Sequence, residues 1–150
     1  AEMQKAMAGL PVHFLGFQND AQLAALYASS DLLVFPSRTD TLGQVVIEAQ
    51  AAGLPVLVSD QGGPKELMDD QITGRVLPAE SPEVWSEAMD ALLSDDPQRM
   101  RMSRIAPRRA GRFSQANGFA AFWEEHVKAA MEDSDSPAAT NARESETVRV

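Results

Sequence analysis

Two runs of uninterrupted apolar residues constrain the fold of this chain more than any other feature. DLLVFPS (31–37) and PVLVS (55–59) have the composition of strands that are buried on both faces, as in a parallel sheet. Between them, residues 42–52 predict a helix with Thr41 as its N-cap and Gly53 just beyond its end. A strand, a helix and a second parallel strand form a βαβ unit with a right-handed crossover. The chain therefore contains at least one α/β unit.

The same alternation continues on both sides of this unit. VHFLGF (12–17) predicts an earlier strand, and residues 74–77 predict a later one. Further helices are expected at 21–30, 64–68 and 81–93, from Asp96 onward, and at 118–131. The predicted fold class is α/β, with a parallel Rossmann-like sheet and flanking helices. Residues 132–150 are polar and are expected to form a mobile tail.

Charge and cysteine content exclude several classes of function. Thirteen Lys and Arg stand against twenty-two Asp and Glu, a net charge of −9, which argues against a general nucleic-acid binder. The absence of cysteine excludes disulfides, thiolate metal sites and a cysteine nucleophile, and the cytoplasm is the expected compartment. No signal peptide or membrane span is predicted. The chain does not begin with Met, and its first residues resemble the end of a helix, so we expect a piece of a longer protein.

The loop SRTDTLG (37–43) occupies the position where open parallel sheets collect ligands. It follows the carboxyl end of a strand and leads into the N-terminus of a helix. Free backbone N–H groups and the positive end of the helix dipole favour an anion there. Gly43 removes the side chain that would keep a phosphate away. The loop therefore suits a diphosphate.

Two carboxylates accompany this loop. Glu48 lies among apolar neighbours in the predicted helix, where an unpaired carboxylate is costly, and Asp40 lies just before that helix. Both can face one pocket at the carboxyl edge of the sheet and accept hydrogen bonds from sugar hydroxyls. The alternative is that Glu48 reaches water or pairs with an arginine. The residue pattern alone leaves both interpretations open.

A longer motif series carries a family resemblance. Its members are Ser37-Arg38-Thr39-Asp40-Thr41-Leu42-Gly43, Val45-Val46-Ile47-Glu48-Ala49, Ala52-Gly53-Leu54-Pro55-Val56, Gly62-Gly63-Pro64-Lys65-Glu66 and Thr73-Gly74. The series resembles the C-terminal nucleotide-sugar-binding domain of family 4 retaining glycosyltransferases, which have the GT-B fold. It runs in the right order from about Val12 to Leu77. By this resemblance, residues 1–131 form an incomplete nucleotide-sugar-binding domain.

The resemblance implies roles for individual residues. Asp40 takes the catalytic acidic position that binds the hexose, and Glu48 the position that binds the ribose. The backbone of Thr41, Leu42 and Gly43 approaches the sugar and the diphosphate. Gly16 and Phe17 border the nucleotide base. The family uses Glu where this chain has Asp40, which is shorter by one methylene, so either the loop makes up the reach to the sugar or the hydroxyl contact differs.

The resemblance also implies the reaction. We expect transfer of a hexose such as mannose from a GDP- or UDP-sugar substrate to a sugar or lipid-linked acceptor, with retention, no metal and no further cofactor. The acceptor would bind a separate N-terminal domain that this chain lacks, so the chain alone is expected to be inactive. The alternatives are a sugar-nucleotide epimerase with the same sheet, and a non-catalytic binding or assembly module.

Two further expectations concern surfaces. In the family's 3-2-1-4-5-6 sheet, strands one and two are missing here, which exposes an edge of strand 32–36. We expect strand 12–17 or a second copy of the chain to cover that edge. The second surface is an arginine-rich helix near the C-terminus. It is interpreted as a solvated helix face, with peripheral membrane or acidic-partner docking as the alternative.

Overall fold

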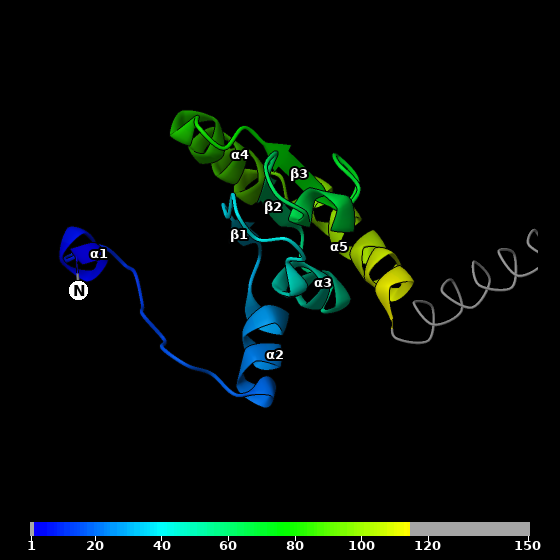
Figure 1. The fold of residues 1–150 in the computed structure, drawn as a ribbon, viewed down its shortest axis with the longest axis horizontal. Coiled ribbons are helices and arrows are strands. Elements are labelled where there is room, and N and C mark those ends of the chain that lie inside the picture. Colours follow the sequence, from blue (N-terminus) through cyan, green and yellow to red (C-terminus); the bar gives the residue numbers. More distant parts are fainter. Residues whose placement is uncertain (1, 115–150) are drawn as a thin grey trace, which may run out of the picture.

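The computed structural model describes residues 2–114 (Figure 1). In chain order the elements are α1 (Glu2–Ala6), α2 (Asp20–Ser29), β1 (Leu33–Phe35), α3 (Gln44–Ala51), β2 (Val56–Ser59), the 3₁₀ helix η1 (Pro64–Leu67), β3 (Gly74–Leu77), α4 (Pro82–Ser94), α5 (Asp96–Ala110) and the 3₁₀ helix η2 (Gly111–Phe113). The predicted helix 118–131 and the predicted tail 132–150 lie outside the described residues. No described helix is long and apolar enough to span a bilayer.

The three strands form one parallel sheet in the order β1-β2-β3. Leu33 is aligned with Val56, and Val56 with Gly74, so the strands run in register from the same end. All four residues of β2 are buried, as expected of a central strand with both faces covered. The predicted parallel pairing of the strands within 31–37 and 55–59 is confirmed.

The two faces of β2 carry two separate parts of the core. Val56 and Val58 pack against Val46 and Ala49 of α3. Leu57, between them in the strand, belongs to a second cluster with Trp85 of α4 and Met102 of α5. Successive side chains of a strand point to opposite faces, so one buried strand organises both clusters. Helix α5 also contacts α3, which closes the body around the sheet.

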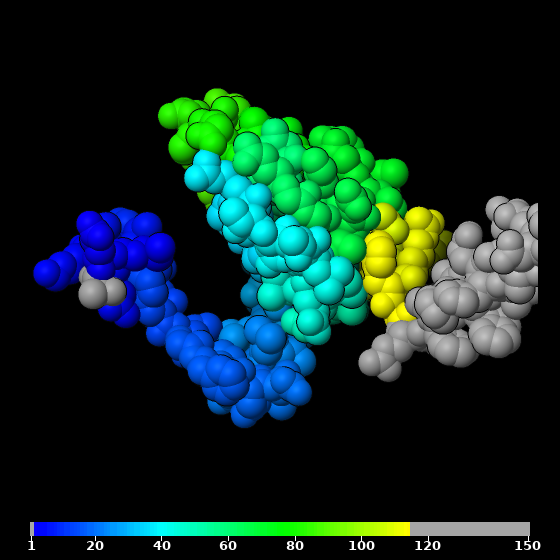
Figure 2. All heavy atoms as spheres, in the orientation of Figure 1, coloured from blue at the N-terminus to red at the C-terminus, as the bar shows by residue number. Residues whose placement is uncertain are grey.

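The predicted strand 12–17 is wrong. Residues 7–17 are all exposed, and Phe17 is 95% exposed. The segment connects α1 to α2 at a distance from the sheet, and Figure 2 shows open space between it and the body. The sheet ends at β1, and no residue between 2 and 114 pairs with its free edge, so a strand at 12–17 would need the strands one and two that the resemblance places between it and β1. Pairing of this edge with a second copy stays a prediction.

Helix α3 also begins later than predicted. Its first residue is Gln44, and its N-cap is Gly43 with a left-handed backbone (φ 66°), whereas Thr41 was the predicted N-cap. Gly53 ends the helix with a positive φ of 82°, as predicted. The shift at the start leaves residues 40–43 as a separate turn. This turn forms part of the candidate site.

Candidate functional site

Two loops interlock at the carboxyl edge of the sheet. The loop after β1 and the loop after β2 meet where the N–H of Gly63 donates to the carbonyl of Asp40 at 3.0 Å. A Cβ on Gly63 would lie 1.9 Å from the carbonyl oxygen of Thr41, and one on Gly62 would lie 2.7 Å from that of Asp40. Side chains are therefore excluded from both positions by backbone. The glycine pair fixes the loop that carries Asp40.

One oxygen of Asp40 is already used by its own turn. Oδ1 accepts hydrogen bonds from the N–H of Leu42 at 3.0 Å and from that of Gly43 at 2.6 Å. An aspartate suits such a turn because its short side chain reaches backbone two residues on. Oδ2 accepts no hydrogen bond from the described residues. The turn therefore gives a structural reason for Asp where the family uses Glu.

The other predicted donor-binding residues, Thr41, Leu42 and Gly43, lie in the turn before α3. Leu42 and Thr41 are exposed, whereas Gly43 is buried against Pro64. A Cβ on Gly43 would lie 2.8 Å from Cγ of Pro64, and its left-handed backbone also favours glycine. Packing thus requires Gly43 independently of any phosphate. We expected the backbone N–H groups of this loop to be free. Those of Leu42 and Gly43 are instead bonded to Asp40.

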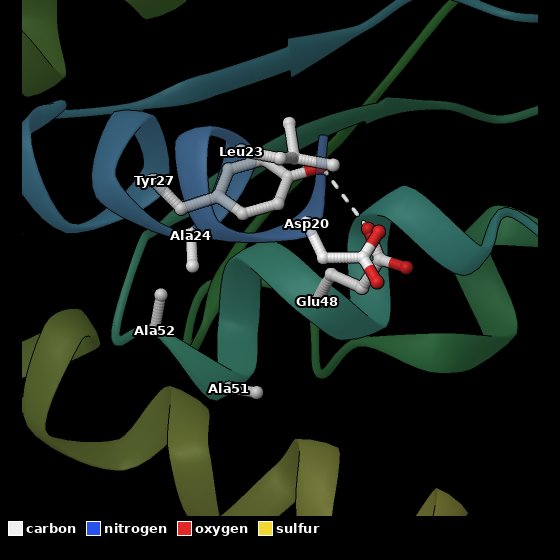
Figure 3. Close-up of a pocket in the computed structure, with 7 residues that line it drawn as sticks. All are labelled: Asp20, Leu23, Ala24, Tyr27, Glu48, Ala51 and Ala52. Carbon is white, nitrogen blue, oxygen red and sulfur yellow. Dashed lines mark hydrogen bonds between the residues drawn. The ribbon is translucent and has the colours of Figure 1, made fainter. Parts of the chain in front are cut away.

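Glu48 faces α2 on the side of α3 away from β2. Its Oε2 accepts a hydrogen bond from the hydroxyl of Tyr27 at 3.3 Å (Figure 3). The pair lies in an open hollow of about 390 Å³ between the two helices. The hollow is lined by Asp20, Leu23, Ala24, Tyr27, Glu48, Ala51 and Ala52. The alternative in which Glu48 pairs with an arginine is not found among residues 2–114, where a tyrosine hydroxyl is its partner.

The surroundings of Tyr27 change the pKa of its phenol. Burial, the nearby charge of Glu48 and the hydrogen bond to it, in that order, raise the pKa of the Tyr27 phenol above its ordinary value. The phenol therefore stays protonated and keeps donating to Glu48 throughout the neutral range. One carboxylate oxygen is held in place while Glu48 remains half-buried at the wall of the hollow.

The predicted site residues fall into two groups. Asp40 and Glu48 are not bonded to each other, and Asp40 does not line the hollow. Glu48 lies five positions after Gly43, roughly 7.5 Å along the helix axis, and Asp40 lies in the turn before the helix, so the predicted single pocket with both carboxylates is not found. Gly16 and Phe17 lie in the exposed segment before α2 and do not line the hollow.

Sequence reasoning placed neither Asp20 nor Tyr27 in the site. They lie seven residues apart on α2, a spacing that places both on one helix face. Tyr27 is the only tyrosine of the chain, and its pattern on the predicted helix indicated only a core position. No signal in the spacing identifies it, because the contact joins two different helices.

Two cations also lie at the carboxyl edge. Arg38 follows β1 and forms an exposed ion pair with Glu80, which follows β3. Lys65 donates from Nζ to the carbonyl of Asp60 at 2.6 Å. The sequence motif contained both residues, but no role was assigned to them. Within residues 2–114, no three His, Asp or Glu side chains are placed to hold a metal ion.

A family match covers this whole arrangement. Residues 1–109 match the family described as glycosyl transferases group 1. The chain belongs to this family. The group 1 match includes both interlocked loops, α3 and the Tyr27–Glu48 hollow, so the site lies within the family's common part.

Curated relatives agree with this family assignment. The group 1 chain is 35% identical over 106 residues to the D-inositol 3-phosphate glycosyltransferase of Corynebacterium urealyticum, across 71% of this chain and 25% of that protein. It is 41% identical over 98 residues to the enzyme of that name from Segniliparus rotundus, across 65% of this chain and 22% of that protein. The chain thus spans about a quarter of the length of the curated relatives it matches.

Several solved structures share the fold. Sucrose-phosphate synthase from Thermosynechococcus elongatus superposes with a TM-score of 0.73 at 23% identity, over 88% of this chain and 33% of that one. WaaG, a glycosyltransferase involved in lipopolysaccharide biosynthesis, gives 0.61 at 32% identity, over 69% and 28%. HepE from Anabaena, crystallised in complex with UDP, gives 0.72 at 24% identity, over 83% and 36%. The GT-B fold class is confirmed.

Proposed function

We propose that this chain is the donor-binding part of a retaining glycosyltransferase that uses a nucleoside-diphosphate sugar. One observation carries the proposal. The Glu48 carboxylate, held by Tyr27, faces an open hollow that lies beside the same helix whose N-terminus meets the interlocked loops. A nucleotide sugar needs these two features side by side, a hydroxyl acceptor for the ribose and an anion-tolerant helix start for the diphosphate.

The hollow has the chemistry of a ribose site. Its floor is apolar, formed by Leu23 and the alanines of α2 and α3, and its polar wall is formed by Glu48 and Asp20. An ionised carboxylate is an acceptor only, so Glu48 would take hydrogen bonds from the ribose diol with the oxygen that Tyr27 does not bind. Tyr27 is thus the positioning residue for this contact.

The diphosphate and the hexose would lie toward the start of α3. The helix dipole, together with the cations Arg38 and Lys65, would stabilise the negative charge that develops on the leaving nucleoside diphosphate. Asp40 would accept a hexose hydroxyl through Oδ2 while Oδ1 keeps the turn closed. This catalysis is electrostatic and uses no metal. The ion pair of Arg38 with Glu80 would open when Arg38 turns to phosphate.

The proposal extends to the transferred hexose, the acceptor and the place in the cell where transfer occurs. We infer a hexose such as mannose, an acceptor that is a sugar, polyol or lipid-linked glycan, and transfer on the cytoplasmic side. Relatives are named for an inositol phosphate, which supports a hydroxyl-rich acceptor. The acceptor contacts would come from protein outside these 150 residues.

A calorimetric panel on the 150-residue chain tests the donor assignment. UDP, GDP, UDP-glucose and GDP-mannose would be titrated into wild-type protein, E48Q and the control E87Q, an exposed glutamate on α4. We expect one diphosphate series to bind and E48Q to weaken it by about 1–3 kcal/mol, because glutamine keeps one acceptor oxygen, which Tyr27 occupies, and presents a donor NH2 to the ribose hydroxyls. E87Q should match wild type. Absence of binding by every nucleotide, or equal binding by E48Q, contradicts the proposal.

A further inference from the structure

Six arginines occur between residues 99 and 112, and two of them are structural. Arg99 donates from Nη1 to the carbonyls of Leu92 and Leu93, which ends α4, and forms an ion pair with Asp96. Arg109 donates to the carbonyl of Glu66 at 2.7 Å. Its Nε lies 3.0 Å from Asp69 in an ion pair without the alignment of a hydrogen bond. Both side chains tie α5 to the body.

Three of the remaining arginines form a surface feature that we call the arginine stripe, Arg101, Arg104 and Arg108. Their spacing places them on one face of α5, opposite the buried Met102, Ala106 and Ala110. All three are exposed, and none forms a hydrogen bond or ion pair with any residue between 2 and 114. Nothing in the described body therefore accounts for these charges.

Exposed aliphatic side chains flank the stripe. Met100 is 55% exposed on one side, and Ile105 is 43% exposed on the other. Ile72, from the turn before β3, is 50% exposed and lies with Ile105 and Arg101 around a shallow hollow of about 220 Å³. A guanidinium beside two isoleucines suits a bilayer surface. There the guanidinium would contact a lipid phosphate and the isoleucines the glycerol region.

We propose that the arginine stripe docks this protein on an anionic phospholipid membrane. Lipid phosphates would supply the anions that the three guanidinium groups lack within residues 2–114, and the acidic groups behind the net charge of −9 are screened beyond about 8 Å at physiological salt. The stripe is the outer face of one helix, which fits a flat surface. The flanking methionine and isoleucines favour lipid over nucleic acid, because they offer phosphates no contact but can enter the interfacial layer.

Co-sedimentation with vesicles tests this docking. Wild-type protein would be mixed with vesicles of phosphatidylcholine alone and with vesicles that also contain phosphatidylglycerol. We expect binding only to the second kind, and weaker binding as salt is raised. The variant R101Q/R104Q/R108Q should lose roughly a hundredfold in partition, since each arginine near an anionic surface is worth roughly fivefold.

A charge-matched control separates the stripe from overall charge. K5Q/R143Q/R149Q removes the same three charges elsewhere and should bind as wild type does. The thermal midpoint of the stripe variant should match wild type, because the three side chains have no partners in the described body to lose. Equal binding of wild type and the stripe variant, equal loss in both triple variants, or absence of binding to anionic vesicles overturns the proposal. Nucleotide binding is a separate readout, so this test does not depend on the donor site.

Discussion

VHFLGF (12–17) and the strand VLVS (Val56–Ser59) are both short apolar runs with β-branched residues, yet only the second forms a strand. Every residue of β2 is buried, whereas every residue of 12–17 is exposed. The difference lies in their neighbours, because β2 is paired on both sides and 12–17 is paired on neither. Composition gives a segment the capacity to be a strand. Only a backbone partner and a covering helix make it one.

The largest expected effect separates the two segments directly. Leu57→Ala removes a side chain that is 0% exposed at the centre of β2 and should lower the free energy of unfolding by about 2–5 kcal/mol. Leu15→Ala removes the same atoms from a site that is 54% exposed and should change it by less than about 0.5 kcal/mol. Urea unfolding measures both. A similar cost at the two positions would show that 12–17 is packed after all.

A glycine pair sharpens the comparison at the site. Gly63→Ala forces a Cβ against the Thr41 carbonyl and should cost about 1–3 kcal/mol, because backbone rather than a flexible side chain must move. Gly16→Ala meets no atom within 4 Å, and its positive φ can relax in an unpacked segment. We expect little change there. If Gly63→Ala proved as mild as Gly16→Ala, the two loops would not be interlocked.

Tyr27 is where the N-terminal part meets the body. Tyr27→Phe removes its hydrogen bond to Glu48 and should cost about 0.5–1.5 kcal/mol of unfolding free energy. It should also weaken nucleotide binding, because Glu48 loses its positioning partner. Leu26→Ala on the same helix, also half-buried, serves as a control for packing alone. Loss of nucleotide binding in Leu26→Ala to the same extent would assign Tyr27 a purely structural role.

The smallest expected effect is a pH dependence. The raised pKa of Tyr27 in the folded state means that its contribution to stability is complete below about pH 10 and is lost as pH rises through the folded value. Wild type should therefore lose more stability than Tyr27→Phe above that pH. Tyr27 is the only tyrosine, so phenolate absorbance reports its titration alone. E48Q should lower the Tyr27 pKa but leave the part due to burial.

The sequence predicted the parts of the fold that depend on local pattern plus an available partner. Strand 74–77 and the parallel pairing of the strands after 31 and 55 appear as predicted. The prediction of a strand at 12–17 failed for a physical reason. Strand pairing is non-local, and the motif alone does not tell whether a partner strand exists. The late start of α3 is a similar case. Asp40 and Gly43 form a turn that competes with helix, as short polar residues do.

The site was predicted in part for the same reason. The sequence predicted that Asp40 and Glu48 face one pocket, whereas the structure gives them different neighbours, since Asp40 bonds to its own turn and Glu48 to Tyr27. Tyr27 comes from another helix, and contacts between helices cannot be obtained from spacing within one of them. The sequence showed the glycine pair at 62 and 63 only as part of the motif series. Its packing against the Asp40 loop is visible only in three dimensions.

The central claim is that Glu48, held by Tyr27, binds the ribose diol of the donor. Calorimetric titration with the nucleoside diphosphate that binds best, and with its 2′,3′-dideoxy analogue, tests it in wild type and E48Q. We predict that wild type binds the ribonucleotide more tightly by about 1–3 kcal/mol, and that E48Q binds the two nucleotides equally. If wild type shows no preference, or if E48Q keeps the full preference, Glu48 does not bind the ribose and the account is contradicted.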